Sequence, residues 1–170
     1  MLPPKWRKIL APILLSLVLL VSACSAPTTS PYDQVQEDTT GRNAPAAVAD
    51  DAVKGGSFNA FFPRSQDGFD VVPAQEKQGF AEYKLNRDGT TVAMLSINDT
   101  SGNPDAAQKF QASTRQVGGY PAVDVGSTQT AILVANRFQV KVQSRDPAFA
   151  VSDREAWLTK FNLSGLAQVK

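Results

Sequence analysis

The sequence predicts an α+β fold: a single small domain with a largely antiparallel sheet of about five to six strands and two main helices. Short runs that alternate apolar and polar residues, such as Phe138–Val142, recur between turn residues. Two helix-like segments interrupt and follow these runs, in the order hairpin, helix, meander, helix. With 170 residues, of which 42% are hydrophobic and 19% charged, the chain is long enough for one globular domain.

The first 23 residues are typical of an export signal. Basic residues within the first eight positions precede a short apolar run from Ile9 to Val21. As a helix this run would rise only about 20 Å, which is shorter than the hydrocarbon core of a bilayer, about 30 Å. We therefore expect residues 1–23 to be a signal peptide and not a membrane span.

The apolar run ends in Val21-Ser22-Ala23-Cys24, and Cys24 is the only cysteine of the chain. This motif resembles the lipobox of bacterial lipoproteins, in which a peptidase cuts before a cysteine that carries diacylglycerol. The resemblance implies an exported protein anchored in the membrane by lipidated Cys24, on the periplasmic face or on the lumenal face of a thylakoid. The alternative is an ordinary secretory signal with a stray cysteine close to the cleavage site.

Residues 24–54 are expected to form the acylated cysteine and a flexible tether. They are rich in Pro, Ala, Thr and Asp and poor in large apolar residues. The folded domain is expected to span residues 55–170, beginning at Gly55-Gly56. An aromatic cluster follows, and we expect it to cap one end of the core; its members are Phe58, Phe61 and Phe62.

The first half of the domain contains three strand signals. Phe69–Val72 ends at Pro73, which favours an edge strand. Phe80–Leu85 and Thr90–Ile97 flank the turn Asn86–Gly89, so they predict a β-hairpin. The second of these strands is apolar on both faces, which indicates a central position in the sheet.

A helix and three further strands follow the hairpin. The helix is expected to start with Asn103 as its N-cap, to run to about Arg115 and to stop at Gly118-Gly119. The strands are expected at Ala122–Val125, Thr130–Val134 and Phe138–Val142.

The last element is a helix with the spacing of a capping box, in which Ser152 is the cap and Glu155 lies three residues on. We expect it to end at Gly165. Its apolar stripe is expected to face the core and consists of Trp157, Leu158 and Phe161.

Catalysis finds little support in the residue types. The chain has no histidine, and no Ser-x-x-Lys motif occurs. A net charge of +1 gives no electrostatic argument for nucleic acid binding. The loop Asp99–Asp105 has oxygen-bearing side chains as calcium loops do, but Pro104 and Phe110 stand where an EF-hand needs glycine and glutamate. We therefore predict no cofactor, no metal and no enzymatic activity.

A basic surface is the main candidate for binding a partner. Arg137, Lys141 and Arg145 lie on or beside one predicted strand. They could bind an acidic partner, or they could form the solvated face of a half-covered sheet.

Several segments of the domain also resemble small cyanobacterial lipoproteins to which no activity is assigned. The resemblance lies in Gly55–Phe58, Gln78–Glu82, Gly119–Val123 and Arg137–Val142. It implies a setting in which lipid-anchored subunits and assembly factors sit on the lumenal face of photosystems.

The leading hypothesis is accordingly a lipid-anchored, non-enzymatic binding module or accessory factor of a membrane complex. One alternative is a small-ligand-binding lipoprotein with a pocket lined by Tyr83, Tyr120 or Trp157. Another is a hydrolase that uses carboxylates, for which a domain of this size leaves little room for a deep cleft.

Overall fold

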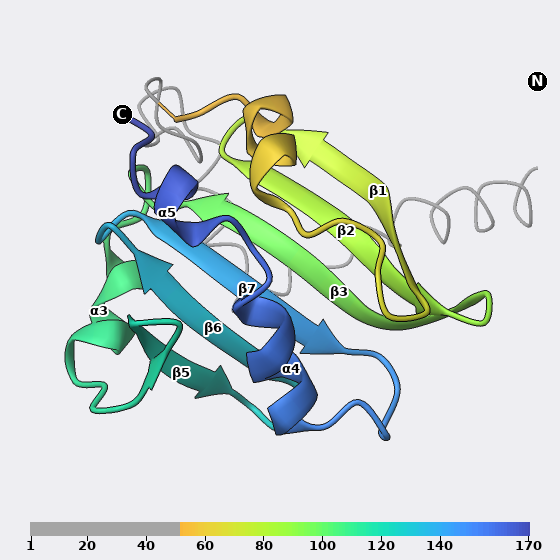
Figure 1. Ribbon diagram of the computed structural model, residues 1–170. Coiled ribbons are helices and arrows are strands. Elements are labelled where there is room, and N and C mark those ends of the chain that lie inside the picture. The colour runs from red at the N-terminus through yellow and green to blue at the C-terminus, as the bar shows by residue number, and fades with distance from the viewer. Residues whose placement is uncertain (1–51) are drawn as a thin grey trace, which may run out of the picture. The chain divides into compact units, whose positions relative to one another are not determined.

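The computed structural model describes residues 52–170, which form one antiparallel sheet with short helices on both of its faces (Figure 1). The predicted signal peptide, the lipobox with Cys24 and nearly all of the predicted tether lie outside the described residues. Within residues 52–170, no helix is long and apolar enough to span a membrane. The elements are η1 (Gly55–Phe61), β1 (Phe69–Lys77), β2 (Phe80–Arg87), β3 (Thr90–Asp99), α3 (Asp105–Gln111), β4 (Gln116–Val117), β5 (Tyr120–Val125), β6 (Gln129–Val134), β7 (Phe138–Ser144), α4 (Val151–Leu158) and α5 (Leu163–Leu166).

The sheet has seven strands in the order β1-β2-β3-β7-β6-β5-β4, and all neighbours are antiparallel. The α+β class and the antiparallel sheet are confirmed, and β3 is a central strand as expected. The strand count of five to six was wrong, because the two-residue strand β4 adds a seventh. Two meanders, β1–β3 and β4–β7, are joined where β3 pairs with β7.

The extra strand replaces the end of the first predicted helix. That helix was expected to run to Arg115, but α3 ends at Gln111, and Gly118-Gly119 form the turn between β4 and β5. Both glycines have positive φ, which suits the hairpin turn. Strand pairing prevails here because Arg115 accepts a backbone hydrogen bond from Ala122. The cap also differs: Pro104 holds the N-cap position, and no Asn103 side-chain cap forms.

β1 is an edge strand, as predicted, but it does not end at Pro73. It continues to Lys77 through an irregularity between Pro73 and Gln75, where the register with β2 shifts by one residue. A proline is tolerated in an edge strand or at a bulge because no ladder hydrogen bond is lost where its nitrogen faces solvent or an interrupted pairing.

The last predicted helix is split into α4 and α5. The N-cap of α4 is Ala150, and its backbone N–H donates to the Asp153 carboxylate at 2.8 Å, so Ser152 lies inside the helix and is not its cap. Gly165 does not end a helix but lies within α5. A second start is possible there because the Asn162 side chain accepts the Gly165 N–H at 3.0 Å.

The main core lies on one face of the sheet, which we call the inner face, under η1, α4 and α5 (Figure 1). The aromatic cluster caps it as expected: Phe58 and Phe62 are buried, and Phe61 packs at the edge. Phe62 stacks on Tyr83 with ring centroids 4.0 Å apart. The predicted stripe of Trp157, Leu158 and Phe161 is also buried in this core.

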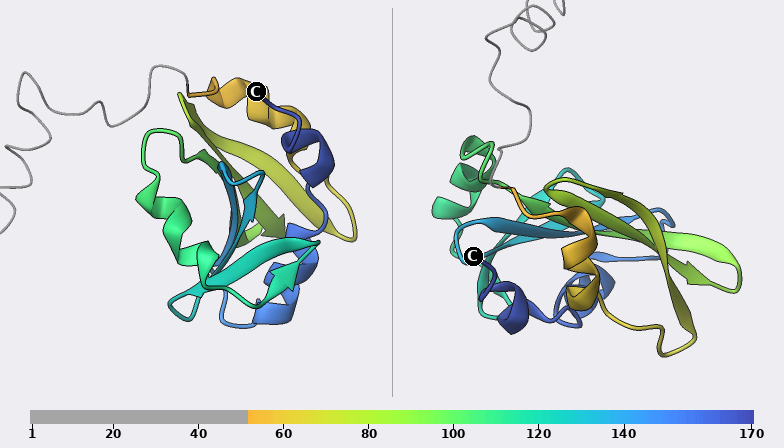
Figure 2. Two further views of the ribbon diagram at one scale, coloured as in Figure 1. Left: turned by 90° about the vertical axis from the view of Figure 1, so that its left-hand side faces the viewer. Right: turned by 90° about the horizontal axis from the view of Figure 1, so that it is seen from above.

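The opposite, outer face carries α3 alone of the described helices (Figure 2). Phe110 of α3 packs on Ala131 and Leu133 of β6 in a small separate cluster. The main contacts of α3 are with β5 and β6, so none of the described helices packs extensively on the outer face of β1, β2, β3 and β7.

The first described element, η1, begins at Gly55, after Ala52, which is buried, and Val53, which packs against the main core. A side chain at Gly55 would collide with the backbone oxygens of Lys77 and Phe80, so only glycine allows η1 to approach the β1–β2 turn this closely.

Candidate functional site

The three predicted basic residues lie along β7 and do not cluster. Four residues of a strand span about 13 Å, so Arg137, Lys141 and Arg145 are spaced over roughly 27 Å. Each has a different environment. Whether they bind a partner stays a prediction.

Arg137 stands at the start of β7 and pairs with Asp99 at the end of β3. Its Nε and Nη2 atoms donate to the two carboxylate oxygens at 2.9 and 2.8 Å. The Asp99 side chain is fully buried and also accepts the backbone N–H groups of Val53 and Ser101, each at 3.0 Å. Burial would raise the pKa of Asp99, but the bonds from Arg137 and from the two N–H groups prevail and lower it to about 2. This pair ties three segments together.

The first carboxylate of the loop after β3, that of Asp99, is therefore already occupied by hydrogen bonds within the protein. Asp99 is the residue that a calcium loop would have needed as its first ligand. Within residues 52–170, no group of three or more His, Cys, Asp or Glu side chains is placed to hold a metal ion.

Lys141 lies in the middle of β7 on the outer face. Four lysines, which we call the basic face, share that side of the molecule: Lys77, Lys84, Lys109 and Lys141. The strand register places Lys77 and Lys84 there, because they pair with Phe80 and Met94, which lie on the outer face. Burial, and secondly the charge of Lys141, lower the pKa of Lys109 on α3, which therefore lies close to Lys141. The lysines outnumber Asp70 and Glu82, the acids on the same face of these strands.

Arg145 follows β7 directly and is exposed. It lines a pocket of about 340 Å³ between the β5–β6 turn and the loop from β7 to α4. We call this the arginine pocket, because Arg154 of α4 lines it as well.

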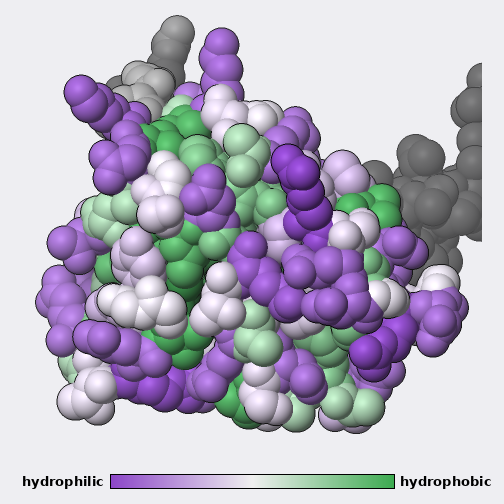
Figure 3. Space-filling view, in the orientation of Figure 1, coloured by the Kyte–Doolittle hydropathy of each residue, from purple (hydrophilic) through white to green (hydrophobic). Residues whose placement is uncertain are grey.

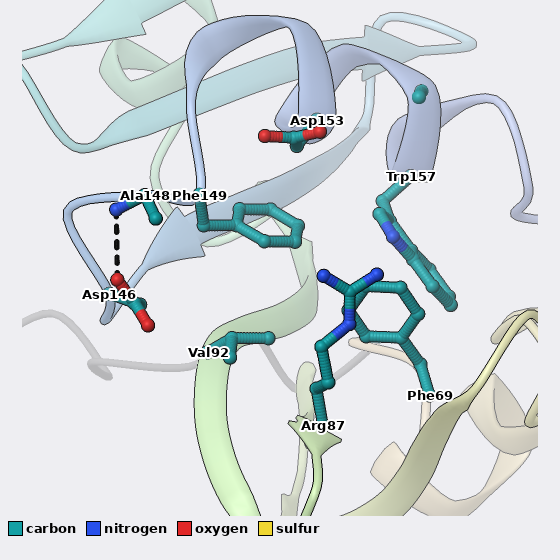
Figure 4. Close-up of a pocket in the computed structure, with 9 residues that line it drawn as sticks. Phe69, Arg87, Val92, Asp146, Ala148, Phe149, Asp153 and Trp157 are labelled. Atoms are coloured by element: carbon teal, nitrogen blue, oxygen red, sulfur yellow. Dashed lines mark hydrogen bonds between the residues drawn. The ribbon is translucent and has the colours of Figure 1, made fainter.

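A second pocket of about 200 Å³, the aromatic pocket, lies beside it and shares Asp146 and Phe149 with it. The Arg87 guanidinium stacks over the Phe69 ring, 4.1 Å from its centroid, and in Figure 4 Phe149 and Trp157 flank it. Trp157 meets Phe69 edge to face, with centroids 5.2 Å apart. The pocket thus combines three aromatic side chains with one planar cation.

Of the three aromatic residues proposed to line a ligand pocket, only Trp157 lines the aromatic pocket. Tyr83 instead stacks on Phe62 in the core, where burial and then the charge of Glu76 raise its pKa. The two acids of the pocket have structural roles: Asp146 accepts the Ala148 N–H at 2.8 Å (Figure 4), and Asp153 accepts the N–H of Ala150.

The exposed large apolar side chains are scattered over different elements. Those described as such are Val72, Val125 and Val151, which belong to three different elements. In the view of Figure 3, hydrophobic surface is interrupted by hydrophilic side chains. An extended apolar docking patch is therefore not formed by these described residues.

Sequence reasoning overlooked Arg154, which is only 3% exposed. The sequence gives one weak indication that Arg154 is buried. Arg154 is three residues before Trp157 and so shares the face of α4 that packs on the sheet. Comparison with protein-family models, curated proteins and solved structures found no match.

Proposed function

We propose that this protein is a lipid-anchored, non-enzymatic binding protein that docks through its basic face onto an acidic surface of a membrane protein complex. The proposal rests on which face of the sheet the helices cover and on where the lysine side chains lie. Helices pack over the inner face, whereas on the outer face α3 packs mainly on β5 and β6, and the lysines of β1, β2 and β7 lie beside it. Complementary charge favours encounter with an acidic partner and sets its orientation.

Anchoring would make a modest interface sufficient. A flexible tether from Cys24 to Lys54 would have an r.m.s. reach of about 30 Å. The domain would then be confined to a thin layer at the membrane, which raises its effective concentration for membrane partners.

The anchor is tested by Cys24→Ala. We expect the variant to move from the membrane fraction to the soluble fraction, because the acyl chains can no longer be attached. Its melting temperature should match that of the wild-type domain. The matched control is Ser25→Ala, which should remain in the membrane fraction. A Cys24→Ala protein that stays with the membrane would contradict lipid anchoring.

The docking face is tested by the double variant Lys84→Glu, Lys141→Glu. On native gels of gently solubilised membranes, a tagged wild-type chain should co-migrate with a large complex, and the double variant should migrate as a monomer. The control Arg64→Glu, Lys170→Glu makes the same change in net charge away from the basic face, and it should still co-migrate. Loss of co-migration in both double variants would refute the basic face as the docking site.

A second candidate function is binding of a small ligand, which the aromatic pocket favours. Three aromatic rings around a stacked guanidinium suit a planar anionic molecule, although 200 Å³ is small for a ligand site. If the wild-type chain migrates as a monomer, mass spectrometry of small molecules retained by the native protein should identify such a ligand. Arg87→Ala should abolish its retention.

A further inference from the structure

The arginine pocket contains a buried cation that has no direct carboxylate partner among the described residues. Arg154 is 3% exposed, and its Nε and Nη1 atoms donate to the hydroxyls of Thr130 at 2.9 Å and Ser144 at 3.0 Å. Hydroxyls satisfy donors but do not neutralise a charge. A buried guanidinium is costly unless an anion compensates it.

The nearest carboxylate on this network is already engaged. Asp124 accepts the Thr130 hydroxyl at 2.7 Å, but it is also held by Arg115 through two bonds of 2.7 and 3.0 Å. The hydrogen bond from Arg115 is the main cause that lowers the pKa of Asp124, and the charge of Arg154 contributes last. Asp124 therefore orients Thr130, and through it Arg154, while its own charge is paired with Arg115.

The remaining lining of the pocket supplies further donors. Arg145 brings a second, exposed guanidinium, and the β5–β6 turn brings the hydroxyls of Ser127 and Thr128. Asp146 is the one acid that lines this pocket among the described residues, and its Oδ1 atom accepts the Ala148 N–H. Two guanidinium groups and two hydroxyls around one space are the donor set that recognises a phosphate group.

The dimensions suit such a group. A volume of about 340 Å³ corresponds to roughly eleven water molecules at about 30 Å³ each. The pocket is therefore large enough for a phosphate together with a small substituent, and small for a drug-sized ligand.

We propose that the arginine pocket binds a phosphate group through Arg145 and Arg154, either as inorganic phosphate or as the phosphodiester of an anionic lipid headgroup. The proposal that a phosphate group binds here depends only on the residues that line the pocket. Only the headgroup as its source rests on the proposed membrane anchor, which would hold the domain near a lipid surface.

The test uses the full-length protein purified in a neutral detergent. Isothermal titration with inorganic phosphate, and with dihexanoyl phosphatidylglycerol below its micellar concentration, should show one site, and either ligand should raise the melting temperature. Tighter binding of the lipid by about tenfold or more would identify a headgroup site, and tighter binding of phosphate a site for the free anion.

Variants decide whether the arginine pocket is the site. Arg145→Gln, at an exposed position, should weaken binding by about tenfold without changing the fold, and Arg154→Lys should weaken it at least as much. The matched control Arg64→Gln should bind like the wild type. Absence of binding to both probes would overturn the proposal, as would equal affinity of Arg145→Gln, Arg64→Gln and the wild type.

Discussion

Replacing Trp157 with alanine is expected to lower the free energy of unfolding by about 3–5 kcal/mol. The indole is only 3% exposed and belongs to the main core. It meets Phe69 edge to face, so its loss would leave a cavity between α4 and the edge strand β1. Chemical denaturation monitored by circular dichroism measures the change.

The control for Trp157 lies on the same helix. Val151 is 42% exposed, and Val151→Ala should change the free energy of unfolding by no more than about 0.5 kcal/mol. Trp157 is also the residue that a ligand-binding function would use as an anchor. An unchanged melting temperature of Trp157→Ala, combined with loss of a bound partner or ligand, would show that its role is binding and not packing.

Replacing Asp99 with asparagine is expected to lower the free energy of unfolding by about 3 kcal/mol. The carboxylate is fully buried and receives four hydrogen bonds, two from Arg137 and two from backbone N–H groups. The variant removes the charge that compensates Arg137 and turns an amide group toward other donors. The matched control is Asp67→Asn, which weakens the exposed pair with Lys160 and should cost less than about 1 kcal/mol.

The same residue predicts a pH dependence. Its pKa in the folded state is about 2, below the ordinary value of 3.8. A lowered pKa contributes stability above the unfolded-state value, and that stability is lost as the pH falls through the folded-state value. The wild type should therefore lose stability between pH about 4 and about 2, and Asp99→Asn should lose less over the same range. Parallel pH profiles of the two proteins would contradict the assigned role of Asp99.

Local patterns predicted the hairpin and the central strand correctly, because both depend on neighbouring residues. The turn Asn86–Gly89 joins β2 and β3 as expected, with positive φ at Asp88 and Gly89. The alternation in β7 correctly separated Phe138, Val140 and Val142 on the inner face from the polar residues between them.

Helix ends were predicted less well, because competing partners decide them. Arg115 was expected at the end of a helix, but it pairs with Asp124 and lies 3.5 Å from Glu155. Glu155 itself was expected to complete a capping box, and Asp153 takes that role instead. An arginine suits a helix end as well as an ion pair, and either acid suits the capping position. The local sequence therefore could not decide between these roles.

In the candidate functional site, the difference between what local sequence predicts and what distant partners decide is larger still. Basic residues on one strand could be recognised from the sequence, but their environments could not. Arg137 pairs with a residue 38 positions away, and Arg154 with a hydroxyl 24 positions away. No periodicity records such pairings.

The sequence by itself determined the α+β class, most of the strands, the residues of β7 that face the core and the prediction of a lipid anchor at Cys24. These follow from periodicity, turn residues and a short motif, all of which are local properties of the chain. Only the tertiary structure decided that β4 forms, that Arg137 is paired internally, and that Arg145 and Arg154 line one pocket. Those outcomes depend on which distant segments meet, and on the cost of burying a charge once they do.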